Sequence, residues 1–237
     1  MSEQDVTVRI PAGSRADRIS TAVDRLAAKL ARHWLALFNT IVAMFVLLPF
    51  LAPVLMHLGL ERPAGVIYLI YQPTCHQLPE RSFFLFGPQG AYSVAELEAE
   101  GALPAGSTLG QRGMMRYEGN SDIGYKIAIC ERDVAIYGSI LLGGLLYGIA
   151  RSTLARRGRR VPKLPVKIYL IFLLPMLIDG VTQLMGLRES VWPLRLATGM
   201  LVGLATVWLA YPHIDDAMRD TLRSMPAERA RSAEGTP

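Results

Sequence analysis

Charged residues are scarce in this chain of 237 residues: only 19% are Asp, Glu, Lys or Arg, whereas 51% are hydrophobic. Soluble domains usually carry about 25% charged residues. The shortage excludes an intrinsically disordered chain and favours a membrane protein. Cysteine is scarcer still, because the chain holds two. Two cysteines are too few for a disulfide-stapled scaffold, but they suffice for one disulfide bond or half of a metal site.

The sequence also lacks the local motifs of several large enzyme classes. It contains no phosphate-binding glycine loop, no dinucleotide-binding fingerprint, no His-Glu-x-x-His and no Gly-x-Ser-x-Gly. The net charge of +5 comes without any nucleic-acid-binding motif, so we expect no nucleic-acid partner. These absences leave open whether the protein is an enzyme.

Apolar runs long enough to cross a bilayer as helices, which takes about 20 residues, occur four times. The first run has no charged residue, and its prolines, Pro49 and Pro53, are tolerated in membrane helices. We therefore expect an all-α integral membrane protein with four transmembrane helices. The predicted spans are residues 34–58, 130–150, 166–187 and 192–211.

Polar segments flank the first span and end the chain. Residues 14–33, within an N-terminal segment 1–33, place apolar residues at helical spacing among basic ones. This pattern predicts an amphipathic helix on the membrane surface, with Ser14 as its N-cap. Residues 212–237 predict a short helix followed by a disordered tail.

A long polar loop, residues 59–129, connects the first two spans. Within it, Val66–Tyr71 is apolar but too short to cross a bilayer. Residues 93–100 begin with Ser and carry Glu three residues later, which predicts a short capped helix.

The orientation follows from residues 151–167, which carry seven basic residues and no acidic one. Short basic loops stay in the cytoplasm. Both termini are therefore predicted to be cytoplasmic, and the loop 59–129 to lie outside. In a bacterial plasma membrane this multi-pass topology exposes Cys75 and Cys130 to the oxidising side.

Three polar clusters are predicted to meet in the outer leaflet: residues 75–82, residues 130–133, and a group around Asp179. An acidic residue inside a span is costly and usually points into the bundle. The alternative is an Asp179–Arg195 ion pair that only joins two helices. In the functional interpretation, Asp179 accepts a proton and the arginines hold an anion. The candidate catalytic residues are Asp179, Gln183, Arg195 and Arg81.

The first two clusters contain the donor types of a zinc site, and thiolates also suit copper. One alternative is a Cys75–Cys130 disulfide that pins the long loop to the second span. Another is a pair of redox-active thiols tuned by nearby arginines. The candidate metal ligands are Cys75, His76, Cys130 and Asp133.

Arginines also gather at the predicted outer side. They either bind an anionic group such as a lipid phosphate or form an ion network with neighbouring acids. The arginines are Arg81, Arg132, Arg188 and Arg195, and the acids are Glu131, Asp133, Asp179 and Glu189.

The chain combines four motifs: Cys75-His76-x-x-Pro79-x-Arg81-Ser82-Phe83-Phe84, Cys130-x-Arg132, Asp179-Gly180-x-x-Gln183 and Arg195-x-x-Thr198-Gly199. Over about residues 65 to 205 it thereby resembles a family of bacterial integral membrane proteins, the domain of unknown function 2085 family. The resemblance implies a polytopic membrane protein and brings no activity. Many members have a second cysteine three residues after the position of Cys130, where this chain has Asp133. That departure argues against a thiol-rich metal site or a Cys-x-x-Cys redox pair and leaves a mixed Cys/His/Asp site open.

The sequence thus predicts a membrane protein with an extracytoplasmic Cys/His/Asp/Arg site for metal binding or thiol redox chemistry. One alternative is a structural accessory or assembly subunit of a membrane complex, held together by the disulfide. Another is a small oligomeric transporter. The pairs Gly144/Gly148 and Gly199/Gly203 suit either packing within the chain or a homo-oligomer.

Overall fold

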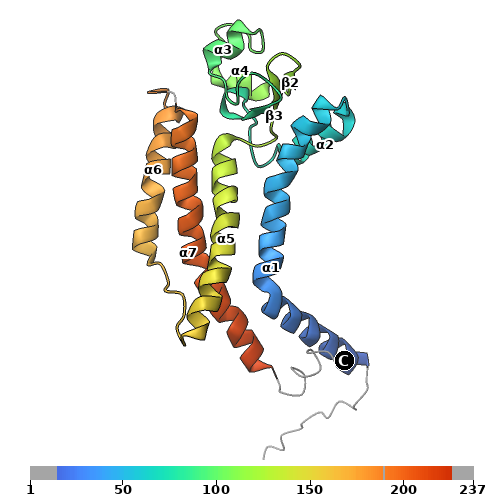
Figure 1. Cartoon of the computed structure of the whole chain (residues 1–237), viewed down its shortest axis with the longest axis vertical. Coiled ribbons are helices and arrows are strands. Elements are labelled where there is room, and N and C mark those ends of the chain that lie inside the picture. The colour runs from blue at the N-terminus through green and yellow to red at the C-terminus, as the bar shows by residue number, and fades with distance from the viewer. Residues whose placement is uncertain (1–14, 189, 226–237) are drawn as a thin grey trace, which may run out of the picture. The chain divides into compact units, whose positions relative to one another are not determined.

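The computed structural model describes residues 15–188 and 190–225, and four helices within these ranges are long and apolar enough to cross a membrane. The predicted all-α fold with four spanning helices is confirmed (Figure 1). The helices are α1 (Arg15–His57), α5 (Glu131–Arg156), α6 (Val166–Leu184) and α7 (Trp192–Ser224).

Three of these helices are longer than the predicted spans, and α5 is one of them because it continues to Arg156. Helix α1 joins the predicted amphipathic helix and the first span without a break, and α7 continues through Pro212. The predicted N-cap Ser14 and the predicted tail beyond residue 225 lie outside the described residues. The chain divides into two compact units, one of Met1–Phe38 with His213–Pro237 and one of Asn39–Pro212.

In the unit of Met1–Phe38 and His213–Pro237, helix α1 exposes a row of apolar side chains. Ile19, Val23 and Leu26 are each 59% exposed. An interfacial helix presents such a face to lipid, and its place on the membrane surface stays a prediction. In the same unit, Trp34 donates from Nε1 to the buried Asp215 carboxylate at 3.4 Å.

In the unit of Asn39–Pro212, α7 packs closely against α5 at its glycines. A Cβ atom on Gly203 would lie 2.0 Å from Ser139 Oγ and 2.4 Å from the carbonyl oxygen of Ile136. The Gly199 position is similarly tight, since a Cβ there would lie 2.9 Å from the Ala135 Cβ atom. This glycine pair therefore packs two helices within one chain, as small residues do in membrane bundles.

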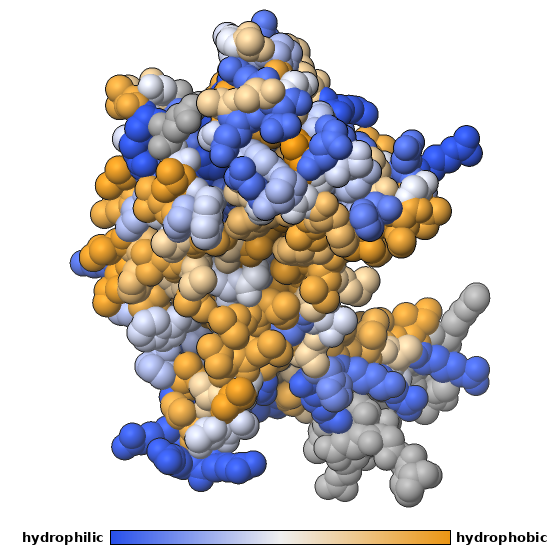
Figure 2. All heavy atoms as spheres, turned by 45° about the horizontal axis from the view of Figure 1, so that its top comes forward, coloured by the Kyte–Doolittle hydropathy of each residue, from blue (hydrophilic) through white to orange (hydrophobic). Residues whose placement is uncertain are grey.

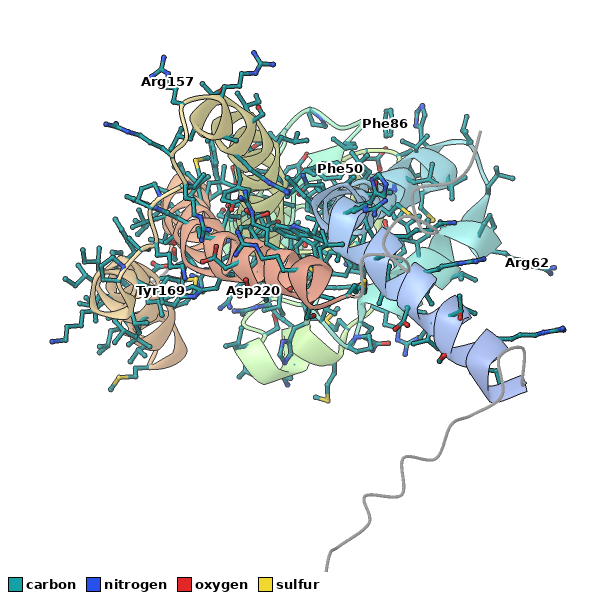
Figure 3. All side chains as sticks on the ribbon, turned by 90° about the horizontal axis from the view of Figure 1, so that it is seen from below. Phe50, Arg62, Phe86, Arg157, Tyr169 and Asp220 are labelled. Carbon is teal, nitrogen blue, oxygen red and sulfur yellow. The ribbon has the colours of Figure 1, made fainter. Side chains whose placement is uncertain are left out.

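The outer faces of these helices are apolar. Leu47 on α1, Ile149 on α5 and Ile171 on α6 are 64%, 64% and 61% exposed. Figure 2 shows hydrophobic side chains gathered over the helices and hydrophilic ones above them. At the opposite end, Arg157 follows α5 and points away from the helices (Figure 3). An apolar surface this extensive requires lipid around it.

The segment between α1 and α5 is folded rather than a plain polar loop, which corrects the sequence expectation. Three antiparallel strands form a sheet in the order β1-β3-β2, with Phe84 opposite Lys126. Side chains from Phe84, Tyr92 and Leu97 build a small core beside it. The elements are α2 (Glu61–Tyr71), η1 (Pro79–Arg81), β1 (Phe84–Leu85), α3 (Val94–Ala99), α4 (Leu109–Met114), β2 (Gly119–Asn120) and β3 (Gly124–Lys126).

Capping boxes start two of these short helices. Ser93 and Glu96 form the box that begins α3, so the predicted capped helix is confirmed. Thr108 and Gln111 form a second box at the start of α4, a Thr-x-x-Gln pattern that also signals a helix start in sequence.

Two prolines in α1 help to hold the α1–α5 segment on the bundle. Proline has no N–H, so Pro49 and Pro53 leave the carbonyls four residues earlier without a helical partner. The Tyr71 hydroxyl donates to the freed Phe45 carbonyl at 2.8 Å. The Ala128 N–H donates to the freed Pro49 carbonyl at 3.3 Å. Tyr71, near the beginning of the segment, and Ala128, near its end, thus both donate to carbonyls that the prolines leave free.

Candidate functional site

The three predicted polar clusters lie at one end of the helices in the unit of Asn39–Pro212. The start of α5, the end of α6 and the start of α7 meet there, below the α1–α5 segment (Figure 1). The loop after α2 and the short helix η1 complete the site. The site has two parts. The cysteine cluster is Cys75, Cys130 and Asp133, and the arginine cluster is Arg132, Arg188 and Arg195 with the acids Asp179 and Glu131.

The cysteine cluster consists of Cys75, Cys130 and Asp133. The two sulfur atoms and a carboxylate oxygen of Asp133 all lie within 4.8 Å of one another. Cys75 follows α2 and is buried, and Cys130 is the N-cap residue of α5. Both cysteines are free in the structure, and the disulfide stays a prediction. Three donors of this kind at this spacing can converge on one metal ion.

The two thiols differ in acidity. A hydrogen bond with the Cys130 side chain holds the pKa of the Cys75 thiol below its usual range. The main-chain N–H of Gln77 also donates to Cys75 Sγ, at 3.4 Å. The same thiol contact, followed by burial, raises the pKa of Cys130. Cys75 is therefore the sulfur that becomes a thiolate first.

His76, predicted as a fourth metal ligand, is not part of this cluster among the described residues. Its side chain is exposed while that of its neighbour Cys75 is buried. Consecutive residues of a nonhelical segment readily face different environments, which explains the separation. His76 instead lines a cavity of about 330 Å³ together with Tyr68 and Lys126.

The arginine cluster pairs its charges differently from the sequence expectation. Asp179 is 1% exposed and accepts hydrogen bonds from Arg132, from Arg188 at 2.6 Å and from the Ser190 hydroxyl at 3.0 Å. Arg195 pairs with Glu131 at 2.8 Å instead. The predicted Asp179–Arg195 pair was therefore wrong.

The physical reason is geometric competition. Arg132 and Arg188 already occupy the two carboxylate oxygens of Asp179. Arg195 reaches Glu131 from the first turn of α7 and also donates to the Glu80 carbonyl at 3.1 Å. Glu189, another predicted member of this network, lies outside the described residues.

A cavity of about 640 Å³ opens beside the arginine cluster, and it is lined by the candidates Arg81, Gln183 and Arg195. Arg81 makes no hydrogen bond to any described residue, and its Nε atom is buried without a partner. Burial and the neighbouring Arg195 lower the pKa of the Arg81 guanidinium. Arg81 is thus a partly buried cation that has no ion-pair partner in the part of the chain that the structure describes.

Sequence reasoning missed two residues of this region, Arg112 and Lys126. Arg112 of α4 pairs with the buried Glu80 at 2.9 Å. Lys126 is 2% exposed, lies 5.0 Å from the centre of the Tyr68 ring, and has its pKa lowered to about 8 by burial. A lysine inside the apolar run 123–129 is the sequence signal that could have identified Lys126.

Comparisons with known proteins agree with the motif resemblance. Residues 123–209 match a family model described as predicted membrane protein (DUF2085), which covers the start of α5, Asp179 and Arg195. An uncharacterized protein of the archaeon Methanocaldococcus jannaschii is 32% identical over 174 residues, 71% of this chain and 84% of the relative. No solved structure matches the chain. The chain belongs to the DUF2085 family of predicted membrane proteins.

Proposed function

We propose that this membrane protein binds a zinc ion through Cys75, Cys130 and Asp133. The observation that carries the proposal is the distance of at most 4.8 Å between their donor atoms. Zinc bonds to sulfur are about 2.3 Å long, so two sulfur ligands of a tetrahedral zinc ion lie about 3.8 Å apart. A contraction of about 1 Å or less would bring the donors to that spacing.

The donor set favours zinc over copper. Copper(I) prefers thiolate and thioether ligands, whereas zinc accepts thiolates and carboxylates alike. Asp133, in the first turn of α5, supplies the carboxylate. Three protein ligands leave a fourth coordination position open, and a bound zinc ion would make water or a substrate at that position more acidic.

Elemental analysis of the purified full-length protein tests this proposal. We expect about one zinc per chain in the wild type and in His76→Ala, and almost none in Cys75→Ser or Cys130→Ser. His76→Ala is the matched control, because His76 lies next to Cys75 but outside the cluster. Wild-type protein without zinc would overturn the proposal. If its thiols also become alkylatable only after reduction, the disulfide takes its place.

A second candidate, thiol redox chemistry, is favoured by one observation. Cys75 and Cys130 share a hydrogen bond that lowers the pKa of Cys75, as expected for an attacking thiolate. In this case the zinc-free protein would cycle between a dithiol and a disulfide by exchange with a disulfide of a partner molecule, which is reduced to two thiols as the Cys75–Cys130 bond forms. A redox titration with glutathione that leaves both thiols reduced at every ratio would contradict it.

The proposed site lies on the extracytoplasmic side of the plasma membrane. The support is the basic segment 151–167 at the opposite end of α5, which the positive-inside rule keeps in the cytoplasm. Reporter fusions at Gly158, between α5 and α6, and at Gly106, between α3 and α4, should report opposite sides. Equal signals on one side would overturn this topology.

A further inference from the structure

A cavity of about 640 Å³ is lined by several arginine side chains that the proposed zinc site does not use. Its walls come from α3, α4, the end of α6, the start of α7 and the segment around η1. Four arginines line it: Arg81, Arg112, Arg188 and Arg195. A cavity of this size holds a small organic molecule rather than a single ion.

Three of these arginines have carboxylate partners. Arg112 pairs with Glu80, Arg188 with Asp179, and Arg195 with Glu131. Asp179 also pairs with Arg132, which does not line the cavity. Glu96, which does line it, accepts a hydrogen bond from the Ser93 hydroxyl. Among the described residues that line the cavity, Arg81 is therefore the arginine whose guanidinium has no hydrogen-bonded carboxylate partner.

Two buried guanidinium N–H donors belong to arginines that line the cavity. The Nε atoms of Arg81 and Arg195 are both buried and have no hydrogen-bond partner within residues 15–188 and 190–225. Arg195 as a whole is only 7% exposed. A buried donor without a partner costs free energy that a ligand oxygen would recover. Both residues line the same cavity, so one ligand can contact both side chains, and the buried Nε atoms become accessible to it when the guanidinium groups turn toward it.

The surroundings indicate what kind of anion fits. Arginine forks bind phosphate oxygens in pairs. Next to the cavity, Val191 and Trp192 are 61% and 48% exposed at the start of the membrane helix α7. Exposed apolar and aromatic residues at a helix end lie where lipid headgroups lie. The volume beyond the phosphate leaves room for the organic group attached to it.

We infer that this cavity binds a phosphate ester, with Arg81 as its main phosphate ligand and Arg195 as a second. The phosphate comes either from a phospholipid headgroup or from a soluble phosphate ester. The inference does not depend on the zinc site, because Arg81 and Arg195 are not among its donors.

Binding measurements on the detergent-purified full-length protein test the inference. One arm titrates phosphatidylglycerol in mixed micelles, with phosphatidylcholine as the background lipid, and the other titrates glycerol phosphate in solution. We expect saturable binding in at least one arm, and the arm identifies the source. Arg81→Gln should weaken it about tenfold or more, because a charge-assisted hydrogen bond is lost.

The matched control is Arg62→Gln, which removes a positive charge from α2 at a side chain that projects away from the protein (Figure 3). This variant should bind like the wild type. If Arg81→Gln does not fold, Arg81→Lys keeps the charge but loses the fork, and it should also bind more weakly. Zinc content should stay unchanged in all three variants, which separates this test from that of the zinc site. No binding in either arm, or equal affinities for wild type and Arg81 variants, would overturn the inference.

Discussion

The hydroxyl of Tyr71 donates a hydrogen bond to the main-chain carbonyl of Phe45 at 2.8 Å. Pro49 frees this carbonyl from the hydrogen-bond ladder of α1. The contact therefore ties the end of α2, four residues before Cys75, to a defined turn of a membrane helix. A proline that weakens one helix here provides the acceptor that positions the loop carrying a candidate metal ligand.

The first prediction concerns this contact. Tyr71→Phe should lower the free energy of unfolding by about 1 kcal/mol, because the Phe45 carbonyl loses its donor. In a Pro49→Ala background the loss should shrink, since alanine restores the helical N–H. Unfolding of the four proteins of this cycle in detergent measures the coupling. Tyr125→Phe, on β3, is the control. Equal losses in both backgrounds would contradict the role of the proline.

Helix packing gives the second prediction. Gly203→Ala should destabilise the protein by about 2 kcal/mol, because its Cβ atom would collide with Ser139 Oγ and the Ile136 carbonyl. Gly138→Ala on α5 should be neutral or stabilising, since a Cβ atom there would have no tertiary neighbour within 4 Å. Thermal unfolding of the two variants compares them directly. A similar midpoint for both would argue against close α5–α7 packing.

The buried carboxylate of Asp179 gives the third prediction. Asp179→Asn should lower the free energy of unfolding by about 3 kcal/mol or more, because Arg132 and Arg188 would lose their shared counter-charge. Asp220→Asn removes one partner of an exposed pair with Arg223 and should have almost no effect. Chemical denaturation of both variants provides the test. Wild-type stability of Asp179→Asn would show that this pairing does not hold the helices.

The fourth prediction is a pH dependence that arises from Lys126. Burial lowers its pKa to about 8, whereas an unfolded lysine titrates near about 10.4. Between these values the unfolded chain binds a proton that the folded chain does not, so stability should rise as the pH increases through this window. Below it, Lys126→Met should be more stable than the wild type by roughly 3 kcal/mol.

Unfolding midpoints of wild type and Lys126→Met from pH 7 to pH 10 check this prediction. The two curves should converge at the alkaline end, because the desolvation cost disappears once Lys126 is neutral. Curves that stay parallel would mean that Lys126 keeps its ordinary pKa in the folded protein.

The helices could be read from the sequence because long apolar runs and Ser-x-x-Glu boxes are local signals. The sheet could not, since strands such as Phe84–Leu85 and Gly124–Lys126 are too short to show an alternating pattern. The proximity of Cys75, Cys130 and Asp133 could be predicted, because the order of the spans places all three at the same end of the bundle. The partners of Asp179 could not, because several arginines reach the same end of the bundle and helix rotation decides among them.

The position of the His76 side chain could not be predicted from the sequence either, because it depends on three-dimensional geometry rather than on a local pattern. Adjacent cysteine and histidine suggest a shared ligand set, but the path of the loop after α2 buries one side chain and exposes the other. Only the backbone conformation, which includes a positive φ of 53° at Gln77, determines this outcome.

X-ray absorption at the zinc edge of the purified wild-type protein tests the central claim most directly. The account predicts two sulfur ligands at about 2.3 Å and oxygen ligands at about 2.0 to 2.2 Å. Asp133→Ala should keep both sulfur ligands, because water takes the place of the lost carboxylate oxygen. A zinc-free protein, or a zinc shell of nitrogen and oxygen without sulfur, would contradict a metal site built on Cys75 and Cys130.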